Sequence, residues 1–149
     1  MKYIYIIAAL FLLSITGWYF FYRQPERPLT KLIETPSVYK NASSDLIVVE
    51  RPTPGSVLDK NFAIEGMARG TWFFEASFPV NVVDKFGNIL VATPAQTKAD
   101  WMTQNFVPFR VDIKIPATYS GPATIILRKD NPSGLPEHDA SVSFNVFIK

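Results

Sequence analysis

An uncharged apolar run near the amino terminus constrains this chain more than any other feature. Residues 4–22 read IYIIAALFLLSITGWYFFY and contain no Asp, Glu, Lys or Arg. With about 1.5 Å of rise per residue, a helix of this length just crosses a hydrocarbon core of roughly 30 Å. Aromatic rings, which favour the membrane interface, lie at its far end: Trp18, Tyr19 and Tyr22. We therefore predict a transmembrane anchor or signal-anchor over residues 1–22, which contacts the lipid bilayer through residues 4–22.

A cleaved secretory signal is the alternative for this segment, because such signals also combine a basic residue with an apolar stretch. Here the run is longer than is usual for a signal. The nearest small-residue cleavage candidate, residues 14–16, reads Ser-Ile-Thr rather than Ala-x-Ala. We expect an uncleaved single-pass anchor at the cell membrane, with the rest of the chain outside the cytoplasm. The basic residues on its two sides are nearly balanced, so charge alone leaves the orientation open.

The composition excludes several classes of function. The net charge of +2 is spread without a basic block, so we expect no nucleic-acid partner. The chain has no Cys, which removes disulfides, thiolate nucleophiles and cysteine zinc sites. His138 is the only histidine, so a site with several histidine ligands cannot form within one chain. We therefore expect no metal, no cofactor and no catalytic residue.

The segment that follows the anchor is typical of a linker. Residues 23–44 contain Pro25, Pro28 and Pro36, which disfavour a continuous helix, and end in a polar NASS sequence. The remaining residues, 45–149, are numerous enough to form one domain with its own core. The predicted organisation is therefore an anchor over 1–22, a linker over 23–44 and one domain over 45–149.

That domain has the residue pattern of β-strands. Phe109, Val111, Ile113 and Ile115 alternate with polar residues, and residues 141–149 alternate in the same way. Further β-rich stretches lie at residues 46–50, 62–69, 72–83, 89–93 and 124–128. Turn-forming residues occupy 84–88 and 130–134. About seven short strands in a domain of this size predict an all-β, immunoglobulin-like antiparallel sandwich behind one N-terminal transmembrane helix, with a small barrel as the alternative.

Four segments carry a family resemblance. They are GMARGTWFFEASFPV at 66–80, ADWMTQNFVPF at 99–109, LRKDNPSGLPEHDAS at 127–141 and IVVERPTPGSVLDKNFAIEG at 47–66. Together they resemble the immunoglobulin-like domain of bacterial spore-germination proteins. The resemblance implies the sandwich fold, an exported and membrane-associated or lipid-anchored location in bacteria, and a germination context, without an established ligand or activity.

The aromatic run at 72–74 offers two interpretations. On a regular strand Trp72 and Phe74 would share one face and Phe73 the other, so one set would enter the core and the other could form part of a binding surface. Glu75 follows in an apolar setting, where a carboxylate needs a partner. We expect either an ion pair, with Arg69, Arg110 or Arg128 as the partner, or a hydrogen-bonded carboxylate, rather than a catalytic acid.

Two loops complete the candidate interaction surface. Trp101 and Met102 lie in a long connection, where an exposed tryptophan would indicate a partner surface and a buried one a plug of the domain. Residues 130–139 are rich in oxygen side chains, but turn formation explains them better than a calcium loop. The full candidate set is Trp72, Phe73, Glu75, Trp101, Met102, Asp130, Asn131, Ser133, Gly134 and His138.

These observations favour a noncatalytic binding or scaffolding module at the bacterial cell envelope, with an envelope protein or a cell-wall component as partner. One alternative is an envelope glycan-acting enzyme with two carboxylates of a set at roughly 5 to 10 Å across a cleft. That set is Glu75, Asp100, Asp130 and Asp139. The other alternative is a purely structural accessory subunit that packs against another envelope protein.

Overall fold

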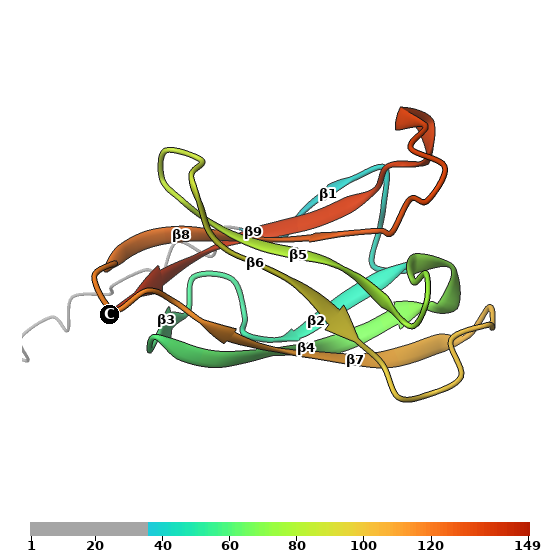
Figure 1. Cartoon of the computed structure of the whole chain (residues 1–149), viewed down its shortest axis with the longest axis horizontal. Coiled ribbons are helices and arrows are strands. Elements are labelled where there is room, and N and C mark those ends of the chain that lie inside the picture. Colours follow the sequence, from blue (N-terminus) through green and yellow to red (C-terminus); the bar gives the residue numbers. More distant parts are fainter. Residues whose placement is uncertain (1–35) are drawn as a thin grey trace, which may run out of the picture. The chain divides into compact units, whose positions relative to one another are not determined.

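The computed structural model describes residues 36–149, and the predicted anchor and most of the predicted linker lie outside this range (Figure 1). Within it, no helix has the length and apolar character needed to cross a membrane. The described residues form nine strands: β1 (Val38–Lys40), β2 (Ile47–Arg51), β3 (Val57–Leu58), β4 (Asn61–Arg69), β5 (Ser77–Asp84), β6 (Ile89–Gln96), β7 (Phe106–Lys114), β8 (Gly121–Arg128) and β9 (Ser141–Ile148). Two short 3₁₀ turns, η1 (Gly70–Trp72) and η2 (Pro136–His138), complete the described elements.

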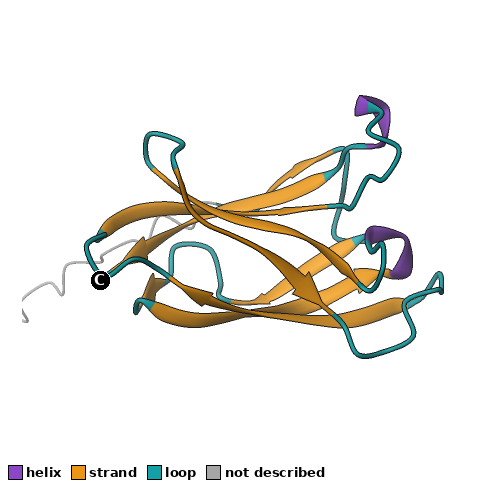
Figure 2. Ribbon diagram, viewed as in Figure 1, coloured by secondary structure: helices purple, strands orange, loops and turns teal. Residues whose placement is uncertain are grey.

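The strands form one curled sheet that folds into two facing layers (Figure 2). One layer contains β2, β4 and β7, and the other contains β1, β9, β8, β5 and β6. All pairs are antiparallel except β3 with β9. The predicted all-β antiparallel architecture is confirmed, with nine strands in place of about seven. The sequence pattern missed β1 and β3 because strands of three and two residues are too short to show an alternation.

The two layers meet at a single residue pair. Gln96 of β6 pairs with Arg110 of β7, and the ladder extends no further in either direction. Pro94 of β6 and Pro108 of β7 each lie two residues from this pair. In the observed register, these are the next positions at which a backbone N–H would have to donate to continue the ladder. Proline has no N–H to donate, so the ladder is weakened on both sides of the pair. The sheet therefore stays a sandwich and does not close into a barrel with a continuous β6–β7 ladder.

The core lies between the layers and follows the predicted alternation. Val107, Phe109, Val111 and Ile113 of β7 are buried, as is every second residue of β9 from Val142 to Ile148. Phe78 is fully buried at the centre of an aromatic cluster. Its ring makes edge contacts with three others at centroid distances of 5.0 to 6.3 Å: Phe109, Phe73 and Trp72. Such aromatic pairs stabilise a core beyond the area they bury.

The aromatic stretch at 72–83 is not one strand, which corrects the prediction. Its start belongs to η1, and Glu75 and Ala76 follow in a tight turn with positive φ angles of 49° and 61° before β5 begins. Because of the 3₁₀ turn, Trp72 and Phe73 do not alternate between faces, and both are buried. Phe74 is left 43% exposed. Strand propensity alone does not reveal this turn.

The described part of the predicted linker contributes to the sheet. β1 lies within 23–44 and pairs with β9 from Val38 beside Ser143 to Lys40 beside Ser141. Tyr39 faces inward and packs against the core. The strand pairing and this apolar contact order β1. The prolines and polar residues of this segment do not by themselves predict a strand.

Candidate interaction surface

Three connections that are far apart in the sequence meet at one end of the sandwich. They are residues 70–76 around η1, residues 97–105 between β6 and β7, and residues 129–140 around η2 (Figure 1). Phe73 lines two surface hollows at this end, one with residues 101–104 and one with residues 129–133. We call this surface the loop end.

Gly70 anchors the connection at 97–105. A Cβ atom on Gly70 would lie 2.1 Å from the Thr103 carbonyl oxygen and 2.2 Å from that of Trp101, so only glycine fits. The Gly70 N–H also donates to the Asn105 carbonyl at 3.1 Å. The loop thus folds back onto η1, and the half-buried Trp101 ring packs against the core. Met102, by contrast, is 77% exposed.

The 129–140 connection is held by its own polar side chains. The Asn131 amide nitrogen donates to the Leu135 carbonyl and to a carboxylate oxygen of Asp139, both at 2.8 Å. The Ser133 hydroxyl donates to the Asn131 side-chain oxygen at 2.6 Å and lies 3.0 Å from His138 Nδ1. Gly134 has a φ of 68°, which suits a turn. These contacts agree with the turn interpretation of the sequence.

The backbone also ties this connection to the rest of the loop end. The Asp130 N–H donates to the Trp72 carbonyl at 3.0 Å. Two shallow hollows of about 370 and 250 Å³ share Thr71 and Phe73 as lining residues. Trp101 and Met102 line the first hollow; Asp130, Asn131, Ser133 and His138 line the second. The structure therefore brings most of the predicted surface residues to one end of the domain.

Three predicted residues line neither hollow. Trp72 is 1% exposed, so it belongs to the core. Its indole N–H is buried and has no partner among the described residues, a condition that costs about 1 to 3 kcal/mol. Gly134 lines neither hollow. Glu75 is exposed on the tight turn and makes no ion pair with a described residue, so its predicted arginine partner is wrong.

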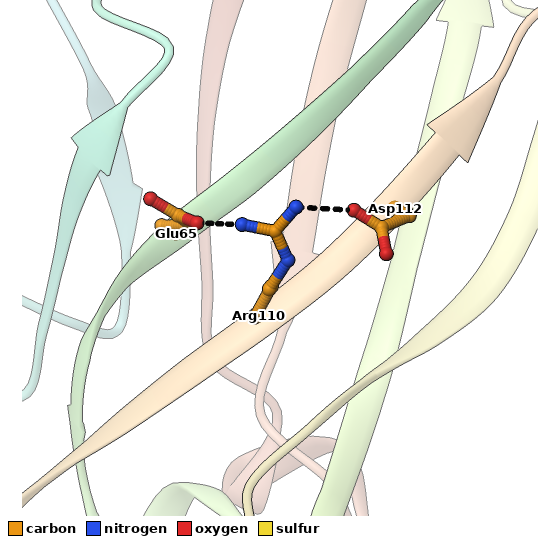
Figure 3. Close-up of polar contacts among 3 residues, drawn as sticks. All are labelled: Glu65, Arg110 and Asp112. Atoms are coloured by element: carbon orange, nitrogen blue, oxygen red, sulfur yellow. Dashed lines mark hydrogen bonds and ion pairs between the residues drawn. The ribbon is translucent and has the colours of Figure 1, made fainter.

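Arg110 has different partners. It pairs with Glu65 and, at 2.7 Å, with Asp112 (Figure 3). Glu65 lies directly opposite Arg110 in the non-hydrogen-bonded register of β4 and β7, where side chains come closest. The hydrogen bond and charge of Asp112 raise the pKa of Arg110 above its ordinary value, with a smaller contribution from Glu65. The alternation of β7 predicts that Arg110 points outward, but only the register between β4 and β7 shows that Glu65 is its partner.

This ion cluster lies in a surface groove with a volume of about 1120 Å³. The groove runs over the outer face of β4 and β7 beside the end of β6, and its wall includes Met67, Pro94 and Lys98. Glu65 and Asp112 both face the same guanidinium, so each of these carboxylates has a cationic partner. The cluster is exposed, and we assign it a structural role in holding β4 and β7 together.

Two of the four acids of the enzyme alternative have local structural roles. An Asp100 carboxylate oxygen accepts the Met102 N–H at 3.0 Å, and the Asp139 carboxylate accepts from Asn131. Residues 36–149 contain no group of three His, Asp or Glu side chains that could hold a metal ion. The described geometry thus provides a surface for contact and gives no particular support to a catalytic pair of carboxylates.

Fold and surface together define an immunoglobulin-like β-sandwich module with a loop-built end. The chain belongs to Gmad2, the family of the immunoglobulin-like domain of bacterial spore germination, whose model matches residues 46–134. The match confirms the family resemblance of the sequence. Searches of curated proteins and of solved structures found no match. β9 follows the matched range and still lies between β8 and the short strands β1 and β3, so the folded unit is longer than the match.

Proposed function

We propose that this protein is a noncatalytic binding or scaffolding module, anchored in the cell membrane by residues 4–22 and facing outward at the bacterial envelope. Family membership makes it a germination-related module. The partner in this proposal is an envelope protein or a cell-wall component, and no cofactor takes part.

The binding role is proposed on the basis of the loop end. Three chain-distant connections converge there, and each presents an exposed apolar side chain: Phe74 at 43%, Met102 at 77% and Leu135 at 47% exposure. The backbone beneath them is fixed by the Gly70 contact and by the Asn131 network. Fixed loops with exposed apolar residues suit binding, because little ordering entropy is lost when a partner docks.

Site-specific photo-crosslinking in living cells tests this function. The crosslinking amino acid replaces Met102 in the full chain, and a second variant carries it in place of Asp112, which is also exposed but lies on the outer face of β7. We expect one envelope component to be captured from position 102 and not from position 112. Equal capture from both positions, or none from position 102, would count against the loop end as the binding surface.

A further inference from the structure

The opposite end of the domain carries a second exposed apolar patch. Val57, Phe147 and Pro122 are direct neighbours across β3, β9 and β8, and Val57 and Phe147 are 57% and 45% exposed. Ile89 of β6 is 62% exposed, and Phe86 in the turn between β5 and β6 is 77% exposed. We call these five residues the turn-end patch. Figure 1 shows the β5–β6 turn and the carboxyl terminus at this end, away from η1 and η2.

The β5–β6 turn holds Phe86 outward. The Asp84 carboxylate accepts the N–H groups of Phe86 and Asn88 at 2.8 and 2.9 Å and the Asn88 side-chain amide at 2.8 Å. Gly87 supplies the positive φ of 86° that this turn needs. The Lys85 ammonium lies 4.9 Å from the centre of the Phe86 ring. An aromatic ring beside an ammonium group is a combination suited to a lipid headgroup region.

Charge separates the two ends. The turns and the terminal residue at the turn end carry Lys60, Lys85 and Lys149 against Asp59 and Asp84. Asp59 pairs with Lys149 at 3.1 Å, and Asp84 is occupied by its own turn. The three connections of the loop end carry Lys98 and Lys129 against five acids, and the strand ends beside them add Arg69 and Arg128. The acids are Glu75, Asp100, Asp130, Glu137 and Asp139. An anionic membrane surface therefore favours the turn end over the loop end.

The chain direction favours the same end. β1 runs antiparallel to β9, so the chain reaches Val38 from the side on which β9 ends. Residues 23–35 separate the proposed anchor from the described domain, and even a fully extended segment of this length reaches only about 45 Å. An anchor attached through such a segment keeps the domain close to the bilayer.

We propose that the turn-end patch docks on the surface of the bilayer that holds the anchor, with Phe86 among anionic headgroups. This inference rests on the membrane anchoring given above as part of the proposed function. It deepens that function, because docking directs the loop end away from the membrane. The occupant of the patch is thus a lipid surface rather than a second protein.

The chain contains no cysteine, so a single introduced cysteine can be labelled selectively. The full chain is reconstituted into phosphatidylethanolamine vesicles that contain phosphatidylglycerol, with one cysteine carrying an environment-sensitive dye. Ala117 lies in the β7–β8 connection at the turn end, Ala99 lies at the loop end, and both are exposed. We expect dye at position 117 to shift its emission to the blue and to be quenched several-fold more by lipid-borne nitroxide than dye at position 99. The added substitution Phe86→Ser should remove most of this difference.

The outcomes separate the two proposals. Failure of the full chain to float with vesicles would contradict anchoring, and with it the proposed function. Flotation with equal quenching at positions 117 and 99 would overturn docking while the anchor stands. A blue shift that depends on protein density at constant lipid composition, without nitroxide quenching, would mean that a second copy covers the patch, and would also overturn lipid docking. Loss of the signal in phosphatidylcholine vesicles would support the role of the lysines.

Discussion

The two ends of this sandwich are built in different ways on one framework. The loop end has connections of seven to twelve residues, stabilised by a close backbone approach at Gly70 and by side-chain hydrogen bonds around Asn131. The β5–β6 turn at the other end has four residues between its strands and is held by one carboxylate, that of Asp84. Long connections provide lining residues for hollows, whereas the short turn holds a single exposed ring, Phe86.

The comparison shows how one fold provides two kinds of surface. The long connections carry acidic side chains beside exposed Phe74, Met102 and Leu135, whereas the tight turn presents Phe86 beside Lys85. Changes at one end should leave the other largely intact, because the two lie at opposite ends of the sandwich and distant sites usually act independently. Substitutions at each end, followed by unfolding free energy and amide exchange, test this independence.

Trp72→Ala should destabilise the fold most. The side chain is 1% exposed and contacts Phe78, so its removal leaves a large cavity. We expect a loss of about 3 to 5 kcal/mol in unfolding free energy, measured by denaturant titration of the full chain in detergent. Unfolding is followed by circular dichroism, because the substitution removes a tryptophan and so changes the fluorescence signal. A loss below about 1 kcal/mol would show that the loop end is not continuous with the core.

Gly70→Ala should disturb the loop end selectively. Its Cβ would overlap two backbone carbonyl oxygens, which cannot move without shifting residues 101–103. We expect about 1 to 3 kcal/mol of destabilisation and faster amide exchange in residues 97–105. Amides of the β5–β6 turn serve as the internal control, and equal acceleration there would contradict independence of the two ends.

Gly87→Ala and Gly134→Ala form a matched pair across the two ends. Both glycines have positive φ, of 86° and 68°, and an added Cβ would meet no atom within 4 Å at either position. The backbone conformation alone should therefore cost about 1 kcal/mol in each variant. Thermal unfolding of both variants measures this cost. A clearly larger loss at Gly87 would show that the four-residue turn also transmits strain to its strands.

Strong acid should loosen the β5–β6 turn. The Asn88 side chain, followed by the backbone N–H groups of the turn, lowers the pKa of Asp84 below its ordinary 3.8. The fold therefore favours the charged carboxylate. Its contribution is complete above pH 3.8 and is lost as the pH falls through the lowered pKa. Amide exchange of Asn88 between pH 7 and pH 2 should show the change, and Asp84→Asn should remove this pH dependence.

Arg110→Gln should have the smallest effect. Its guanidinium lies on the surface, where ion pairs contribute about 0 to 1 kcal/mol and are screened by salt. A double-mutant cycle with Glu65→Gln isolates their coupling. A coupling well above about 1 kcal/mol, maintained at high salt, would show that the groove shields the cluster from solvent.

The sequence predicts the regular strands well and the ends poorly. In β7 and β9 one face is buried along the whole strand, so a period of two appears in the residues themselves. At Trp72 and Phe73 a 3₁₀ turn places adjacent aromatics in the core, and aromatic residues favour strands regardless of such a turn. The contact of Glu65 with Arg110 depends on the register between strands distant in sequence, which the composition of either strand leaves undetermined.

The candidate surface was predictable in part. Loop residues from Asp130 to His138 are polar and turn-forming, so their exposure follows from their chemistry. Whether they would meet Met102 could not be read from the chain, since the meeting depends on which connections share an end. The role of Gly70 was equally hidden, because it arises from the carbonyl groups of residues 101 and 103.

The two prolines beside the Gln96–Arg110 pair also affect whether strand edges of neighbouring copies can pair with one another. Unpaired strand edges recruit neighbouring chains, and each edge of this domain has an obstacle. β1 is short, β2 is bulged after Val49, and Pro94 and Pro108 interrupt donors on β6 and β7. These features disfavour edge-to-edge pairing between copies of the domain.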